Sequence, residues 1–183
     1  MAARLQRLLC FASNTPQNVT ISFSFALVTI VLAPGLGSAS FVEIPPEVFA
    51  QRPVQEYEAE DALRSRRFQV ATNHSDFSGS GFVDYVGEGY VEWTVEVAEA
   101  GTYVLSFRYA LKHGDRPLDI KVNGAVVSSS VSFPATGSWN SWGLVNRDVV
   151  LKSGVNTVRA QTVGRSGANM DRLDVTVSAT STQ

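Results

Sequence analysis

Apolar and polar side chains alternate over most of the chain that follows residue 55. In the segment 90–97, Val and Trp occupy every second position and Tyr, Glu and Thr occupy the positions between them. A period of two is typical of a β-strand with one buried face and one exposed face. The same alternation recurs at 103–109, 118–122, 149–151 and 173–177. We therefore expect a chain of half-buried strands, with no helix of useful length.

Turn-forming residues separate these apolar runs. Asn123 and Gly124 follow one run, Ser153 and Gly154 follow another, and a Gly-rich stretch begins at Gly164. Such spacing is typical of an antiparallel β-sandwich, for which we expect about eight to ten strands. The domain predicted in this way covers residues 55–178, and the tail 179–183 is too polar to pack against it.

The first forty residues differ from the rest, since they contain Arg4 and Arg7 but no Asp or Glu. The apolar run 19–33 is followed by Pro34 and then by small residues up to Ser40. This run is shorter than the ~20 residues that a membrane span needs. We predict that residues 1–40 are a cleaved signal peptide and that the protein is secreted, with a retained membrane anchor as the alternative. Residues 41–54 contain three prolines and are expected to form a linker.

Composition narrows the classes of partner. The 183 residues suffice for one well-buried domain. The net charge is −2, and the acidic and basic residues are scattered along the chain. Without a basic stripe the protein is not expected to bind nucleic acid, nor a membrane once the signal is removed. The single cysteine, Cys10, falls in the leader, so the mature protein would contain no disulfide. Some other feature must stabilise the fold.

Carboxylates cluster where the domain begins. Glu56, Glu58 and Glu60 occupy alternate positions and would project from one face of a strand. They could form an acidic edge that discourages aggregation, or they could bind calcium, which prefers several oxygen ligands. Asp171 and Asp174 near the end of the domain could complete a calcium site, because the first and last strands of a sandwich often pair.

Seven short motifs occur in an order that resembles carbohydrate-binding modules of families 6 and 35. They are YEAEDA at 57–62, GSGFVDY at 79–85, AGTYVLSFRYA at 100–110, VNG at 122–124, TGSWNSW at 136–142, LKSGVN at 151–156 and ANMDRLDV at 168–175. The resemblance implies an all-β, galactose-binding-like jelly roll of two antiparallel sheets, structural calcium and a non-catalytic surface that binds a polysaccharide or glycan.

The resemblance also assigns the calcium ligands. Glu58, Glu60 and Asp171 match the positions whose side chains hold the structural ion in these modules. A cation that bridges the first and last strands would stabilise a domain without disulfides, because metal-binding free energy then adds to folding free energy.

For the sugar, the resemblance points to Trp139, Phe82 and Asn169. The face of an indole ring attracts the C–H groups on one side of a pyranose, and a neighbouring polar group can bond the hydroxyls. Trp142 lies three positions after Trp139 and is expected to point the other way, into the core. The alternatives are core packing for Phe82, a loop plug for Trp139 and an ordinary turn for Asn169.

No catalytic constellation stands out, so we expect a binding protein and not an enzyme. His74 and His113 lack a nucleophile with a partner acid, and Glu88, Glu92 and Asp84 are expected to be solvated charges. Two alternatives are a polysaccharide-active enzyme and a protein-binding or adhesion module. A separate carbohydrate-active enzyme is a possible partner. The arginines of LRSRRF, at 63–68, are expected to be solvated charges, with contact to a uronate as the alternative.

Overall fold

The computed structural model describes residues 18–23, 26–31, 53–164 and 166–178, and the chain divides into two units, residues 1–51 and 52–183. In the first unit, β1 (Asn18–Phe23) and β2 (Ala26–Val31) pair in antiparallel register. The expected leader otherwise lies outside the described residues, as do its cleavage site and the tail 179–183. The signal peptide therefore stays a prediction. In the described part of the chain, the structure has no helix whose length and apolar character would let it cross a membrane.

The second unit contains eleven strands within its described residues. They are β3 (Gln55–Glu58), β4 (Leu63–Arg64), β5 (Gln69–Ala71), β6 (Phe82–Asp84), β7 (Tyr90–Val97), β8 (Gly101–Ala110), β9 (Leu118–Val122), β10 (Ala125–Val131), β11 (Gly143–Leu151), β12 (Gly154–Thr162) and β13 (Asn169–Val177). This exceeds the expected eight to ten because β4, β5 and β6 have only two or three residues each. Strands this short have too few positions for an alternation to show in the sequence.

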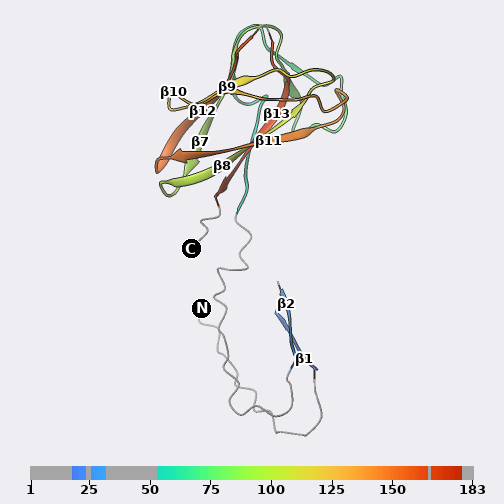
Figure 1. Ribbon diagram of the computed structural model, residues 1–183, viewed down its shortest axis with the longest axis vertical. Helices are drawn as coiled ribbons and strands as arrows, with labels where there is room; N and C mark the ends of the chain where they lie inside the picture. Colours follow the sequence, from blue (N-terminus) through green and yellow to red (C-terminus); the bar gives the residue numbers. More distant parts are fainter. Residues whose placement is uncertain (1–17, 24–25, 32–52, 165, 179–183) are drawn as a thin grey trace. The chain divides into compact units, whose positions relative to one another are not determined.

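These strands form two antiparallel sheets (Figure 1). One sheet has the order β10-β9-β12-β7-β4, and the other has the order β11-β8-β13-β6-β5, with β3 also paired to β13. The prediction of an all-β sandwich of two antiparallel sheets is confirmed. The first and last strands of the domain pair directly, with Tyr57 opposite Leu173, as the sequence predicted.

The core lies between the sheets and follows the alternation of the sequence. The inward positions of β7, β8 and β9 are buried, and the positions between them are intermediate or exposed. Aromatic rings link the two sheets through Trp93 and Phe107, whose centroids lie 6.0 Å apart, and through Phe133, which contacts Phe107 at 6.1 Å and Tyr109 at 5.0 Å. This interior anchors the loops that carry the candidate site.

Candidate functional site

Pairing of β3 with β13 brings Glu58 close to Asp171, and the loop before β6 joins them. The Ser78 hydroxyl lies 2.8 Å from Glu58 Oε2 and 2.8 Å from Asp171 Oδ2. The Ser78 amide donates to Asp171 Oδ1 at 2.9 Å. Two carboxylates far apart in the sequence therefore meet at one serine.

Glu60 approaches the same loop from the other side. Its Oε1 accepts hydrogen bonds from the amides of Ser80 at 2.6 Å and Gly81 at 3.2 Å. Its Oε2 is buried and has no hydrogen-bond partner in the described structure. Gly79 has a φ of 61°, and a Cβ there would lie 2.3 Å from Glu60 Oε1. The positive φ favours glycine at this position, and a Cβ would also crowd the Glu60 carboxylate.

The charges of this cluster are only partly balanced. The guanidinium of Arg108 pairs with Asp171 and also donates to the Asp76 carbonyl at 2.7 Å. Burial raises the pKa of Glu58, as do the charges of Glu60 and Asp171, although the hydrogen bond from Ser78 lowers it. A raised pKa means that the cluster resists a further negative charge.

The donor set suits a hard cation, but it is not arranged around one. Carboxylate oxygens, one of them buried without a partner, are the ligands that calcium prefers. Within residues 53–164 and 166–178, however, no three acidic, histidine or cysteine side chains are spaced as ligands of one ion. The structure brings Glu58, Glu60 and Asp171 to one loop. There Ser78 hydrogen-bonds to Glu58 and Asp171, and Arg108 forms an ion pair with Asp171. Their assignment to calcium stays a prediction.

A second cluster is aromatic and lies on the loops at 72–81 and 132–142. Trp139 is half-buried and packs against the edge of the core. The His74 ring stacks on Trp139 with centroids 6.1 Å apart and planes 14° apart. His74 also stacks on Phe82, at 5.4 Å and 22°. The guanidinium carbon of Arg116 lies 5.6 Å from the Trp139 centroid. One imidazole therefore contacts both aromatic residues that were predicted to hold the sugar.

Trp142 is not the core anchor that its position suggested, and that prediction is wrong. It is half-buried and lies outside the core cluster. Its Nε1 donates to the Ser75 carbonyl at 2.8 Å, and Asn140 Oδ1 accepts from the Ser75 amide at 3.0 Å. The reason is that Trp142 precedes β11, so no strand directs its ring inward. It instead links the two aromatic loops.

Phe82 and Asn169 are the first residues of β6 and β13. Phe82 is 1% exposed and contacts Phe77 at 5.9 Å and the edge of Trp142 at 5.5 Å, in addition to His74. In this arrangement its face is covered. Asn169 is 4% exposed, and its backbone pairs with Ala110. Neither residue is open to solvent as Trp139 is, and their roles in binding stay predictions.

Four residues of these clusters were not predicted from the sequence, namely His74, Ser78, Arg108 and Arg116. A lone histidine or serine in a polar loop has no spacing that marks it. Arg108 could have been suspected, since it alternates with the buried residues of β8 and must leave the sheet on the outer face. The other contacts depend on loops that meet only in the folded chain.

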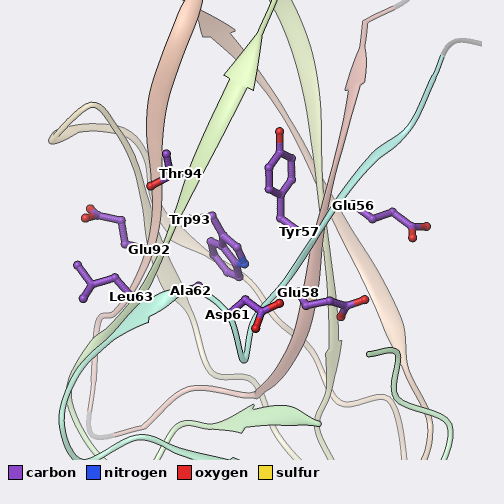
Figure 2. A pocket seen from close by; sticks show the side chains of 9 residues that line it. All are labelled: Glu56, Tyr57, Glu58, Asp61, Ala62, Leu63, Glu92, Trp93 and Thr94. Carbon is purple, nitrogen blue, oxygen red and sulfur yellow. The ribbon is translucent and has the colours of Figure 1, made fainter. Parts of the chain in front are cut away.

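Two hollows lie away from the aromatic cluster. One, of about 550 Å³, is lined by Ser65, Arg66, Arg67 and Glu88. Arg64 is not among these, because its guanidinium donates to the Glu60 carbonyl at 2.9 Å. The other hollow, of about 350 Å³, lies beside Trp93 (Figure 2).

This domain is an antiparallel sandwich that carries partly exposed aromatic rings on its loops. Such an arrangement is typical of β-sandwich modules that bind small ligands. Comparison with known families specifies this class further. Residues 58–178 match the family described as carbohydrate binding module (family 6). The chain therefore belongs to the family 6 carbohydrate-binding modules.

Known relatives agree with this assignment. An exo-beta-D-glucosaminidase of Amycolatopsis orientalis is 42% identical over 124 residues, which are 64% of this chain and 12% of that protein. The chain thus corresponds to a small part of that relative. The family 35 module of Paenibacillus barcinonensis is 41% identical, with a TM-score of 0.65, and the match covers 68% of this chain and 99% of that one. A family 35 module of Clostridium thermocellum is 35% identical, with a TM-score of 0.64 and coverage of 69% and 99%.

Proposed function

We propose that this module binds a glycan by stacking one pyranose ring on Trp139, and that it catalyses no reaction. The near-parallel stack of His74 on Trp139 is the observation that supports this proposal. It shows that a flat ring fits against the indole at the surface of the domain. A pyranose presents its axial C–H groups as a similar flat, apolar face, which the negative face of an indole attracts.

Binding at this face requires His74 to move aside. His74 lies in a loop without regular strand structure, between β5 and β6, and it is itself half-buried. Because a loop side chain changes rotamer at little cost, the sugar can replace the imidazole on Trp139. Displacement would also uncover part of Phe82, which stacks on the same imidazole. Phe82 then forms the second wall of the cleft.

Polar groups around Trp139 would orient the sugar. The Arg116 guanidinium lies over the indole, and its Nη1 donates to the Gly167 carbonyl at 2.9 Å. Asn169 follows two residues later and carries an amide that can both donate and accept. The Arg116 guanidinium supplies hydrogen bonds to the rim hydroxyls, and the ring face supplies contact area. Asn169 is 4% exposed, so its amide takes part only when the cleft opens.

Glu58, Glu60 and Asp171 would hold the structural calcium of this module. The ion would supply positive charge between the first and last strands, where Arg108 pairs with Asp171 and burial, together with the charges of Glu60 and Asp171, keeps the pKa of Glu58 raised. Glu60 Oε2 is the free oxygen that is ready to bind it. We further propose that the protein is secreted and binds glycans outside the cell, alone or beside a separate carbohydrate-active enzyme.

The sugar site is tested with Trp139→Ala in the full chain, screened against a glycan array and then by calorimetry on the best ligand. We expect the affinity to fall by about tenfold or more, as for a central aromatic anchor. Val150→Ala is the matched control, because Val150 is exposed on β11, away from both aromatic loops. His74→Ala should tighten binding, since no imidazole then has to be displaced. Unchanged binding by Trp139→Ala would exclude this cleft.

The calcium site is tested by thermal unfolding with added calcium and with EGTA. At a calcium concentration one hundred times its Kd, the folded state should gain about 2.7 kcal/mol. The variant Asp171→Asn, which removes a proposed ligand, should lose this response. A melting temperature that does not change between calcium and EGTA would remove the ion from the proposal.

A further inference from the structure

A second hollow opens where the edges of the two sheets approach each other. Its volume is about 350 Å³, within the range of roughly 300 to 1,000 Å³ that is typical of small-molecule sites. Its lining comes from β3 of one sheet, from β7 and the end strand β4 of the other sheet, and from the turn between β3 and β4 (Figure 2). None of the residues predicted to contact the sugar at Trp139 belongs to it.

Trp93 forms the floor of this hollow and has an unusual feature for a core residue. It is 2% exposed, yet its Nε1 is buried and has no hydrogen-bond partner in the domain as described. Figure 2 shows the indole nitrogen on the side of the ring that faces the gap between Tyr57 and Asp61. A buried donor without a partner is costly, and such donors in native proteins call for an explanation. An acceptor that enters the hollow would provide one.

The charged lining is acidic throughout. Four carboxylates and no lysine or arginine border the hollow, namely those of Glu56, Glu58, Asp61 and Glu92. Figure 2 shows Glu56, Glu58 and Glu92 directed away from Trp93, and Asp61 placed below its ring. Glu92 pairs with Arg159 at 2.7 Å, and Glu56 lies 3.4 Å from Arg172. Asp61 makes no ion pair or side-chain hydrogen bond with another described residue, so its charge is available to a ligand.

Apolar side chains flank Trp93 on both sides of the hollow. Tyr57 lies on one side of Trp93, and Ala62 and Leu63 lie on the other (Figure 2). Leu63 is 61% exposed, which is high for a leucine beside a concave surface. An aromatic ring and an aliphatic side chain on either side of a slot fit the apolar faces of a sugar ring.

We propose that this hollow is a second glycan subsite, and that it binds a protonated amino-sugar residue. The ammonium group of the ligand forms an ion pair with the Asp61 carboxylate. A ring or hydroxyl oxygen of the sugar accepts a hydrogen bond from Trp93 Nε1. Tyr57 and Leu63 contact the apolar faces of the sugar. The carboxylate of Asp61, unpaired among the described residues, therefore favours a cationic sugar over an anionic one. The Trp139 site has the opposite electrostatic character, because Arg108 and Arg116 lie against its rings.

The three tryptophans of the chain allow a direct test by NMR, since each contributes one indole N–H signal. The variant Trp93→Phe identifies the signal of Trp93 by its loss. The full-length protein, with calcium present, is titrated with a trisaccharide of glucosamine and with its fully N-acetylated counterpart, which has the same backbone without the charge. We expect the amine form to shift the Trp93 signal and to bind at least about tenfold more tightly than the acetylated form.

Two variants locate the effect. Asp61→Asn should weaken the amine form by about tenfold, whereas Asp148→Asn, which changes an exposed carboxylate on β11, should not. Trp139→Ala should leave the shift of the Trp93 signal intact, which separates this subsite from the proposed main site. The proposal is overturned if the Trp93 signal does not respond, if both trisaccharides bind equally, or if Asp61→Asn binds as the wild type does.

Discussion

Two groups of aromatic rings lie in this domain, and they differ in how the chain positions them. The interior rings of Trp93, Phe107 and Tyr109 belong to β7 and β8, where every second side chain points inward. Their contacts, and those of Phe133, are tilted or edge-to-face. Burial on strands of known direction determines where these rings lie.

The outer rings of His74, Trp139 and Trp142 lie on loops. Two of their contacts are close to parallel, and guanidinium groups lie over both indoles. Trp142 and Asn140 hold the Ser75 backbone by hydrogen bonds, which connects the two loops. The comparison shows that strands bury rings by alternation, whereas loops display rings through a few specific bonds. The first group should therefore control stability and the second group binding.

The largest expected effect separates the two groups directly. Phe107→Ala removes a buried ring between Trp93 and Phe133 and should destabilise the domain by about 3–5 kcal/mol. Trp139→Ala should cost less stability, because Trp139 is only partly buried at the edge of the core. Urea unfolding of both variants measures the difference. Equal losses of stability would show that Trp139 belongs to the core.

An intermediate effect is expected where the loops are linked. Trp142→Phe keeps an aromatic ring but removes the bond from Nε1 to the Ser75 carbonyl. The free energy of unfolding should fall by about 0.5–1.5 kcal/mol, and glycan affinity should fall as well, because the loop that carries Trp139 is less well held. Unfolding and calorimetry on the same samples check both. Asn140→Ala, which removes the other bond to Ser75, should behave similarly; a normal affinity in both variants would contradict the role of this link.

The smallest effect concerns an interior ring that carries a polar group. The ring of Tyr85 lies 4.4 Å from that of Phe68, with the two planes tilted by 35°, and its hydroxyl donates to the Ala160 carbonyl at 3.1 Å. Burial raises the pKa of Tyr85 well above the usual value. A raised pKa in the folded state means that its stabilisation is complete below the unfolded pKa of about 10 and is lost as the pH rises above it. Tyr85→Phe should therefore weaken the loss of stability between neutral and alkaline pH. The test is to measure the free energy of unfolding of Tyr85→Phe and of the wild type in buffers set to about pH 8 and about pH 11. An equal loss of stability in both proteins would contradict the prediction.

Much of the fold could be predicted from the sequence, because alternation is a local property. The buried faces of β7, β8 and β9 follow from their residues alone, and the pairing of the first and last strands follows a general tendency of β-sandwiches. The short strands could not be predicted, since two or three residues show no period. The convergence of Glu58, Glu60 and Asp171 on one loop was expected from the family motifs, but their bonds to Ser78 and Arg108 were not.

The amino-acid sequence by itself determined that this is an all-β carbohydrate-binding module, because strand alternation and family motifs are read along the chain. Only the tertiary structure decided which aromatic faces are covered and by what. His74 lies against Trp139 and Phe82, and Trp142 bonds to Ser75, because separate loops meet at one surface. The tertiary structure also decided that the N–H of Trp93 has no partner among the described residues, because the edges of the two sheets leave a space beside it. Local sequence sets the direction of a side chain within a strand, but its neighbours across loops and sheets are set by packing.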